Sequence, residues 1–260
     1  MAEPESIRPE GTEEQIEPLF YPANTLDSGA PLRWLDKGWQ DIRAAPGPSL
    51  AYGGALVAIG WLLTGLALSG GNTLALFTLV TGLILIGPVL AFGLYSISRQ
   101  LEMGLKPRLG FCIRESRTHM RNELLFALVL LVILLVWARA ASMVHVFFPI
   151  SEDLGTLGWL EFLAVGSAVG SIFAGIVFTA AAFSLPMMLD RGTDAITASL
   201  TSVNAVLNNK AAMLVWAALI FGLVLIGVFT AYLGLAVVLP LIGHATWHGY
   251  KETIKPAEPL

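Results

Sequence analysis

The chain has 260 residues, of which 55% are hydrophobic and only 13% charged, and its mean hydropathy is +0.72. Soluble domains carry about 25% charged residues, so this composition excludes an ordinary water-soluble globular protein. The formal net charge is −4, and six of the nineteen acidic residues fall within the first 17 positions. The single cysteine, Cys112, excludes an intramolecular disulfide.

The N-terminal region divides into two parts. Residues 1–31 are acidic and rich in proline without a sustained period, which predicts a disordered acidic tail. Residues 32–45 predict a short amphipathic helix, which either lies in the membrane surface or packs on the protein's own cytoplasmic face. Its apolar positions recur at helical spacing and are Leu32, Leu35, Trp39 and Ile42.

Long charge-free stretches follow. No Asp, Glu, Lys or Arg occurs between Ala44 and Ser98 or between Ala211 and Tyr250. About 20 apolar residues suffice to cross a bilayer as a helix, so each stretch is long enough for two crossings. We therefore predict an all-α membrane domain over residues 32–255 and a C-terminal tail over 256–260. Its six transmembrane helices are expected at about 49–68, 73–97, 123–146, 159–188, 211–229 and 232–249.

Basic residues give the sidedness. They gather in the loops 98–122 and 189–210 and after the last predicted helix, at Lys251 and Lys255, whereas the opposite loops contain none. The positive-inside rule then predicts both termini in the cytoplasm, with six crossings between them. The first loop is expected to contact anionic lipid. Its basic residues are Arg99, Lys106, Arg108, Arg114, Arg117 and Arg121.

The two cytoplasmic loops resemble each other. Leu101-Glu-Met-Gly104 ends one predicted membrane helix, and Leu189-Asp-Arg-Gly192 ends another. After each, an amphipathic stretch leads into the next crossing, with one small gap in the alignment. This pattern predicts a duplicated helical hairpin with an interfacial helix at each cytoplasmic base. A repeat describes architecture and does not by itself indicate transport.

Two histidines stand one helical turn apart near the end of the last predicted helix. His244 and His248 lie on one helix face and are candidate metal ligands. One helix face cannot supply both axial ligands of a haem. The alternative, which we favour, is a polar belt that hydrogen-bonds neighbouring helix ends, because no carboxylate or cysteine is seen to complete a metal site.

Arg139 is the only basic residue inside a predicted membrane segment. Such a charge suggests function by default. An ion pair with Glu161, at the outer start of the next helix, would join the two helices. Extension of Arg139 to the outer headgroups is the alternative and is favoured slightly.

Small residues mark one face of the fourth predicted helix. Gly166, Gly170 and Ala174 recur at a spacing of four. Because small residues let helix backbones approach closely, this face is predicted to pack, either within the bundle or between protomers.

Several motifs together resemble a family of bacterial integral membrane proteins, domain of unknown function 2189. They are the stretch from Gly38 to Pro46, Tyr52-Gly53, the loop 191–199 and the closing stretch from Pro240 to Tyr250. The resemblance covers about residues 32–255. It implies a multi-pass protein of the bacterial inner membrane, and it assigns no catalytic residue.

These observations predict a non-enzymatic scaffold or accessory subunit, with membrane lipid and a homo-oligomer or membrane-complex partner as its contacts. A transporter of small solutes or ions, built on the repeated hairpins, is the alternative. It would need a polar cavity, which the sequence can line only with Thr64, Thr78, Thr81, Ser167, Ser171 and Thr179. A metal- or haem-binding redox accessory is weaker still. No catalytic residue, cofactor or nucleic-acid partner is expected.

Overall fold

The structure is a computed structural model that describes residues 19–69, 90–147 and 155–256, except for the side chains of 67, 113, 115–120 and 145–147. Within this part the chain is helical, apart from an isolated antiparallel bridge between Ala23 and Ile254. Its helices are α1 (Ala30–Ala44), α2 (Pro46–Ser69), α4 (Phe92–Glu102), α5 (Leu109–Phe147), α6 (Thr156–Ala181), α7 (Ser184–Arg191), α8 (Ala195–Asn208), α9 (Lys210–Phe229) and α10 (Leu235–Thr253).

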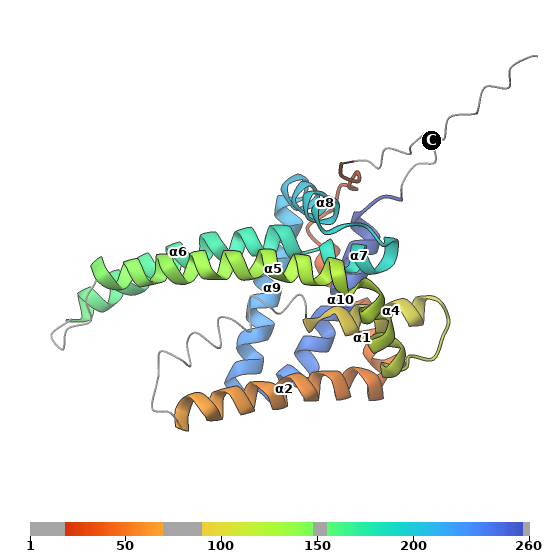
Figure 1. Cartoon of the computed structure of the whole chain (residues 1–260), viewed down its shortest axis with the longest axis horizontal. Coiled ribbons are helices and arrows are strands. Elements are labelled where there is room, and N and C mark those ends of the chain that lie inside the picture. The colour runs from red at the N-terminus through yellow and green to blue at the C-terminus, as the bar shows by residue number, and fades with distance from the viewer. Residues whose placement is uncertain (1–18, 70–89, 148–154, 257–260) are drawn as a thin grey trace, which may run out of the picture.

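The helices form long arms joined to a compact end. Figure 1 shows α5 and α6 side by side as a long hairpin, whose inner end meets the short helices. The short helices α1, α4, α7 and α8 and the C-terminal half of α10 contact one another, and we call this assembly the head. The cartoon places the head where the arms converge (Figure 1).

Four helical segments in the described part are long and apolar enough to cross a membrane. They are Pro46–Leu66, Arg121–Val144, Thr156–Arg191 and Lys210–Phe229. Of the six predicted crossings, the helix at 73–97 lies mostly outside the described residues. The last, at 232–249, corresponds to α10, which is not among the four segments. Six crossings therefore stay a prediction.

Helix α10 runs antiparallel along α2. Ser49 contacts His244 near the start of α2, whereas the indole N–H of Trp61 donates to the carbonyl of Ala231 at its other end. Gly53 lies between these points, and a Cβ atom there would be 2.1 Å from the carbonyl oxygen of Ala236. Only glycine permits so close an approach of two backbones.

A cluster of large aromatic side chains forms the core of the head. Trp34 of α1 is fully buried, and its ring packs edge-on against Phe183 and Trp216 with centroids 6.1 and 5.6 Å away. Edge-to-face pairs contribute about 0.5–1.5 kcal/mol beyond their buried area. The indole N–H donates to Glu252 Oε2 at 3.1 Å, so the buried ring carries no unsatisfied donor.

Helix α1 packs on the protein's own helices through a face that overlaps the predicted stripe in part. Of that stripe, Ile42 is buried and Leu35 is partly buried against the core, whereas Leu32 and Trp39 are exposed. Trp34 and Gly38, which the stripe did not include, are buried against α10. Gly38 allows a close approach of α10 to α1, because Ala245 N lies only 2.8 Å from where a Cβ atom would lie.

The fourth predicted helix, at 159–188, is broken in the structure. Helix α6 ends at Ala181 and α7 begins at Ser184. Pro186 has no N–H and would clash with the carbonyl of residue 182 in a continuous helix, so the chain restarts just before it. Ser202 of α8 supports the break, because its hydroxyl accepts from Phe183 N–H at 3.1 Å and donates to the carbonyl of Thr179 at 2.8 Å.

The two stretches predicted as a repeat share one feature and differ in another. Gly104 and Gly192 both adopt left-handed backbone angles, with φ of +71° and +67°, where the preceding helix ends. The following helix α5 then runs unbroken into a membrane segment, whereas α8 and α9 are separated at Asn209. The duplication itself stays a prediction.

Candidate functional site

A buried hydrogen-bond chain links α1, α2, α4 and α10 in the head. His244 of α10 is fully buried, with Ser49 Oγ 3.0 Å from its Nε2 and Ser98 Oγ 2.7 Å from its Nδ1. Ser98 in turn donates to Asp41 Oδ2 at 2.6 Å. His248 completes the cluster, with its Nε2 2.9 Å from the same carboxylate oxygen.

The carboxylate of Asp41 determines which atom donates and which accepts in these hydrogen bonds. An ionised Asp41 can only accept, so the Ser98 hydroxyl proton points to Asp41 and Ser98 Oγ accepts from His244 Nδ1–H. A neutral imidazole then accepts at Nε2, which receives the hydroxyl proton of Ser49. Each hydroxyl and ring nitrogen in this row of hydrogen bonds from Ser49 to Asp41 therefore has a partner, as buried polar groups require.

The same geometry shows which groups the ring nitrogens of the two histidines contact. Both ring nitrogens of His244 are bound to serine hydroxyls, and His248 is bound to Asp41, so neither presents two free ligands to a metal. No group of three metal-ligating side chains occurs among the described residues. The sequence analysis found no carboxylate at this pair, whereas Asp41 lies 2.9 Å from His248 and 3.9 Å from His244. Metal binding by the pair stays a prediction.

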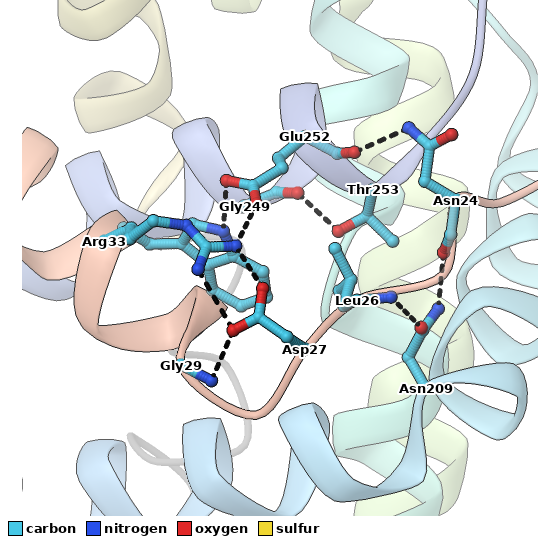
Figure 2. Close-up of polar contacts among 10 residues, drawn as sticks. Asn24, Leu26, Asp27, Gly29, Arg33, Asn209, Gly249, Glu252 and Thr253 are labelled. Carbon is cyan, nitrogen blue, oxygen red and sulfur yellow. Dashed lines mark hydrogen bonds and ion pairs between the residues drawn. The ribbon is translucent and has the colours of Figure 1, made fainter.

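A second cluster ties the N-terminal segment to the end of the chain. Residues 19–29, which we call the strap, lie across α8, α9 and α10 (Figure 2). Asn24 N–H donates to the carbonyl of Thr253 at 2.8 Å, and Lys255 N–H donates to that of Pro22 at 3.0 Å. The disordered tail predicted over 1–31 is thus too long, because residues 19–31 form backbone hydrogen bonds and helix α1 begins within them.

Asn209 is the anchor of the strap. Its side-chain amide accepts from Leu26 N–H at 2.7 Å and donates to the carbonyl of Asn24 at 2.9 Å, as another strand would. Figure 2 shows this amide facing the strap from the junction of α8 and α9. One side chain therefore satisfies two backbone groups of a segment 183 to 185 residues away.

Charged side chains close the strap at its other end. Arg33 donates to both carboxylate oxygens of Asp27, at 3.0 and 2.7 Å, and to Glu252 at 2.7 Å (Figure 2). The Arg33 guanidinium, with the backbone N–H of Gly29, lowers the pKa of Asp27 to about 2. Asp27 is therefore ionised across the physiological range.

A third cluster surrounds the ends of α7 and α10. The hydroxyl of Tyr250 donates to Asp190 Oδ2 at 2.8 Å, and Lys251 Nζ lies 3.2 Å from both Asp190 and Glu102. Burial, followed by the charge of Asp190, raises the pKa of Tyr250, so this hydroxyl keeps its proton. Trp247 N–H donates to Glu102 at 3.0 Å, which connects this cluster to α4.

The predicted ion pair across α5 and α6 is not formed. Arg139 and Glu161 are both exposed, and no ion pair joins them in the part of the chain that the structure describes. The structure therefore gives no support to the predicted pair. Extension of Arg139 toward headgroups stays a prediction.

The predicted packing face of α6 is open within the chain. A Cβ atom at Gly166 or Gly170 would meet nothing within 4 Å, and Ala174 is exposed. The close glycine contacts lie elsewhere, at Gly38 and Gly53 on α1 and α2. Packing within the bundle is therefore not seen on this face, and packing between protomers stays a prediction.

The predicted basic residues do not act as one group. Arg99 lies 3.9 Å from Asp190 and belongs to the cluster around α7. The side chain of Arg117 lies outside the described residues. Lys106, Arg108, Arg114 and Arg121 are exposed.

Two of the hydroxyls proposed to line a transport cavity are bound to their own helix. Ser171 donates to the carbonyl of Ser167 at 2.7 Å, and Thr179 donates to that of Gly175. Ser167 and Ser171 are exposed on α6, and Thr78 and Thr81 lie outside the described residues. Hydroxyls bound in this way are stable next to lipid without a polar cavity.

The partners of the histidines and the strap anchor were not identified from sequence. Ser49, Ser98 and Asp41 lie 146 to 207 residues from their histidine partners. Asn209 is marked by one weak signal, a polar Asn-Asn pair directly before a charge-free stretch.

Comparison with known proteins gives one match. No curated protein and no solved structure matches the chain. Residues 76–190 match the model of the family DUF2189, described as predicted integral membrane protein, and this match confirms the resemblance inferred from the sequence.

Proposed function

We propose that this integral membrane protein is a non-enzymatic scaffold or accessory subunit of a membrane complex. The observation that carries the proposal is the use of polar side chains in the head. The side chains of His244, Asp41 and Asn209 form hydrogen bonds that connect segments from distant parts of the chain. Such groups rigidify a fold and hold a fixed surface for a partner.

The position of the chain ends supports a common side for both termini. Ala23 and Ile254 form a bridge, so the segment before the first membrane helix lies next to the segment after the last one. Together with the basic loops, this arrangement supports an even number of crossings and cytoplasmic termini. We infer a location in the bacterial inner membrane from the family resemblance.

The open face of α6 offers a place for a partner helix. Gly166 and Gly170 have free space where side chains would lie, and helices associate in lipid through such small residues. The partner is a second copy of this chain or another membrane protein.

Crosslinking in native membranes tests the proposal. A stable protein partner should be captured with the full-length chain, and Gly170→Leu should reduce the yield of that crosslink severalfold. Gly60→Leu is the matched control, because a Cβ atom at Gly60 on α2 also meets nothing within 4 Å. Capture of lipid alone would contradict the scaffold function.

A further inference from the structure

A cavity lies where the ends of α7 and α10 meet. It has a volume of about 370 Å³ and is lined by Asp190, Arg191, Lys251, Ile254 and Pro256. Two of these five residues are cations and one is an anion. The cavity is distinct from the buried histidine chain and from the open face of α6.

Arg191 is held rigidly at this cavity, and its hydrogen bonding is incomplete. Nε donates to the hydroxyl of Tyr250 at 2.8 Å, and Nη2 donates to the carbonyl of Ile254 at 3.3 Å. The guanidinium carbon lies 4.8 Å from the ring centre of Tyr21 and 5.6 Å from that of Tyr250. The remaining amino group, Nη1, is buried and has no hydrogen-bond partner.

An unsatisfied buried donor calls for an explanation. Leaving such a group without an acceptor costs about 1–3 kcal/mol, and more for a charged group. In native structures these rare groups often mark a water or ion at the site. An arginine that is held by two hydrogen bonds and lies over aromatic rings is already oriented for an anion, because little side-chain entropy remains to be lost.

The charges around the cavity leave Arg191 without a counterion. Asp190 is shared by Lys251 at 3.2 Å and Arg99 at 3.9 Å, and Lys251 is shared in turn with Glu102. No carboxylate forms an ion pair with Arg191 within the described ranges. Arg191 therefore has no ion-pair partner in this part of the chain.

We propose that Arg191 and Lys251 bind a phosphate group in this cavity. The planar guanidinium matches two phosphate oxygens, and the flexible ammonium of Lys251 adds a point charge. Arg191 ends the apolar segment Thr156–Arg191, one of the four that are long and apolar enough to cross a membrane, which agrees with a site near phospholipid headgroups. A phospholipid headgroup and free inorganic phosphate offer the same chemistry. This site does not depend on the scaffold function.

Two measurements on the full-length protein in neutral detergent distinguish the sources. The first titrates inorganic phosphate at constant ionic strength and follows the unfolding midpoint, which rises with ligand that binds only the folded state. The second measures by native mass spectrometry whether phosphatidylglycerol is retained in preference to phosphatidylcholine. A rise in the unfolding midpoint with added phosphate identifies inorganic phosphate as the ligand. Retention of phosphatidylglycerol without such a rise identifies a lipid headgroup as the ligand. No response in either measurement overturns the proposal.

Variants locate the response. Arg191→Gln should weaken phosphate or phosphatidylglycerol binding at least about tenfold, since a tenfold change corresponds to about 1.4 kcal/mol. Lys251→Gln, which leaves the stacked arginine in place, should weaken it severalfold and keeps the test valid if Arg191→Gln does not fold. Lys255→Gln is the control, because Lys255 is exposed and does not line the cavity. Equal binding by Lys251→Gln and Lys255→Gln would refute the assignment.

Discussion

Replacing Gly53 by alanine tests the close packing of α2 on α10. The new Cβ atom would lie 2.1 Å from the carbonyl oxygen of Ala236 and 2.8 Å from the ring of Pro240. Because ordinary contacts begin near 3.4 Å, the two backbones must separate by more than 1 Å. No side-chain rotation relieves a clash with a backbone atom.

The magnitude follows from two opposing effects. Overpacking of this kind costs about 1–3 kcal/mol or more, whereas exchanging glycine for alanine inside a helix gains about 0.5–1 kcal/mol. We therefore expect Gly53→Ala to destabilise the protein by about 1–2 kcal/mol. In proteins of this size that loss lowers the unfolding midpoint by roughly 2–8 °C.

The neighbouring Gly54 supplies the control. A Cβ atom there meets nothing within 4 Å, so Gly54→Ala makes the same chemical change without the clash and should leave the midpoint equal or slightly higher. Thermal unfolding of both variants, followed by tryptophan fluorescence in one detergent, gives the comparison. A midpoint for Gly53→Ala at or above that of Gly54→Ala would refute the reasoning.

Three further outcomes are expected. Asn209→Ala should speed proteolysis and deuterium uptake of the strap, because two backbone groups lose their partner, whereas Asn208→Ala, which removes only a contact within α8, should not; equal protection in both would contradict the anchoring role. The pKa of Asp27 is lowered to about 2, below its ordinary value of 3.8, so its ion pair stabilises the strap above pH 3.8 and that stability is lost as pH falls through 2. Strap protection should accordingly be constant from pH 7 to pH 4 in the wild type and reduced at both by Asp27→Asn, and a loss of protection between pH 7 and pH 5 would argue against this pair. His244→Ala should lower the unfolding midpoint by several degrees, since the buried Ser49 hydroxyl loses its partner in this cluster at about 1–3 kcal/mol, while Ser98 keeps only Asp41; an unchanged midpoint would mean that these buried hydrogen bonds contribute nothing to stability.

The apolar arms could be predicted from the sequence, and the head could not. Charge-free stretches of membrane length depend only on composition along the chain, and four such segments are found in the structure. The break at Ala182–Phe183 was missed because Pro186 was read as part of a continuous helix, although proline excludes the bond that continuity needs.

The head depends on contacts between distant segments, which no local pattern reports. The pairing of His244 and His248 was visible from their spacing, but their partners Ser49, Ser98 and Asp41 come from three other helices. The motifs at 38–46 and 240–250 that suggested the family lie outside the matched residues 76–190. In the structure these two motifs pack on each other, as Gly38 on α1 contacts Ala245 on α10.

The antiparallel contact of α2 with α10 also imposes an order on biosynthesis. Ser49 leaves the ribosome 195 residues before its partner His244, and at about 5–20 residues per second that interval is roughly 10–40 s. During this time the backbone of α2 at Gly53 and the side chain of Trp34 lack their contacts with α10. Helix α2 therefore lacks its packing partner until α10 is synthesised. A nascent chain truncated before α10 should be a preferred substrate for membrane chaperones and quality-control proteases.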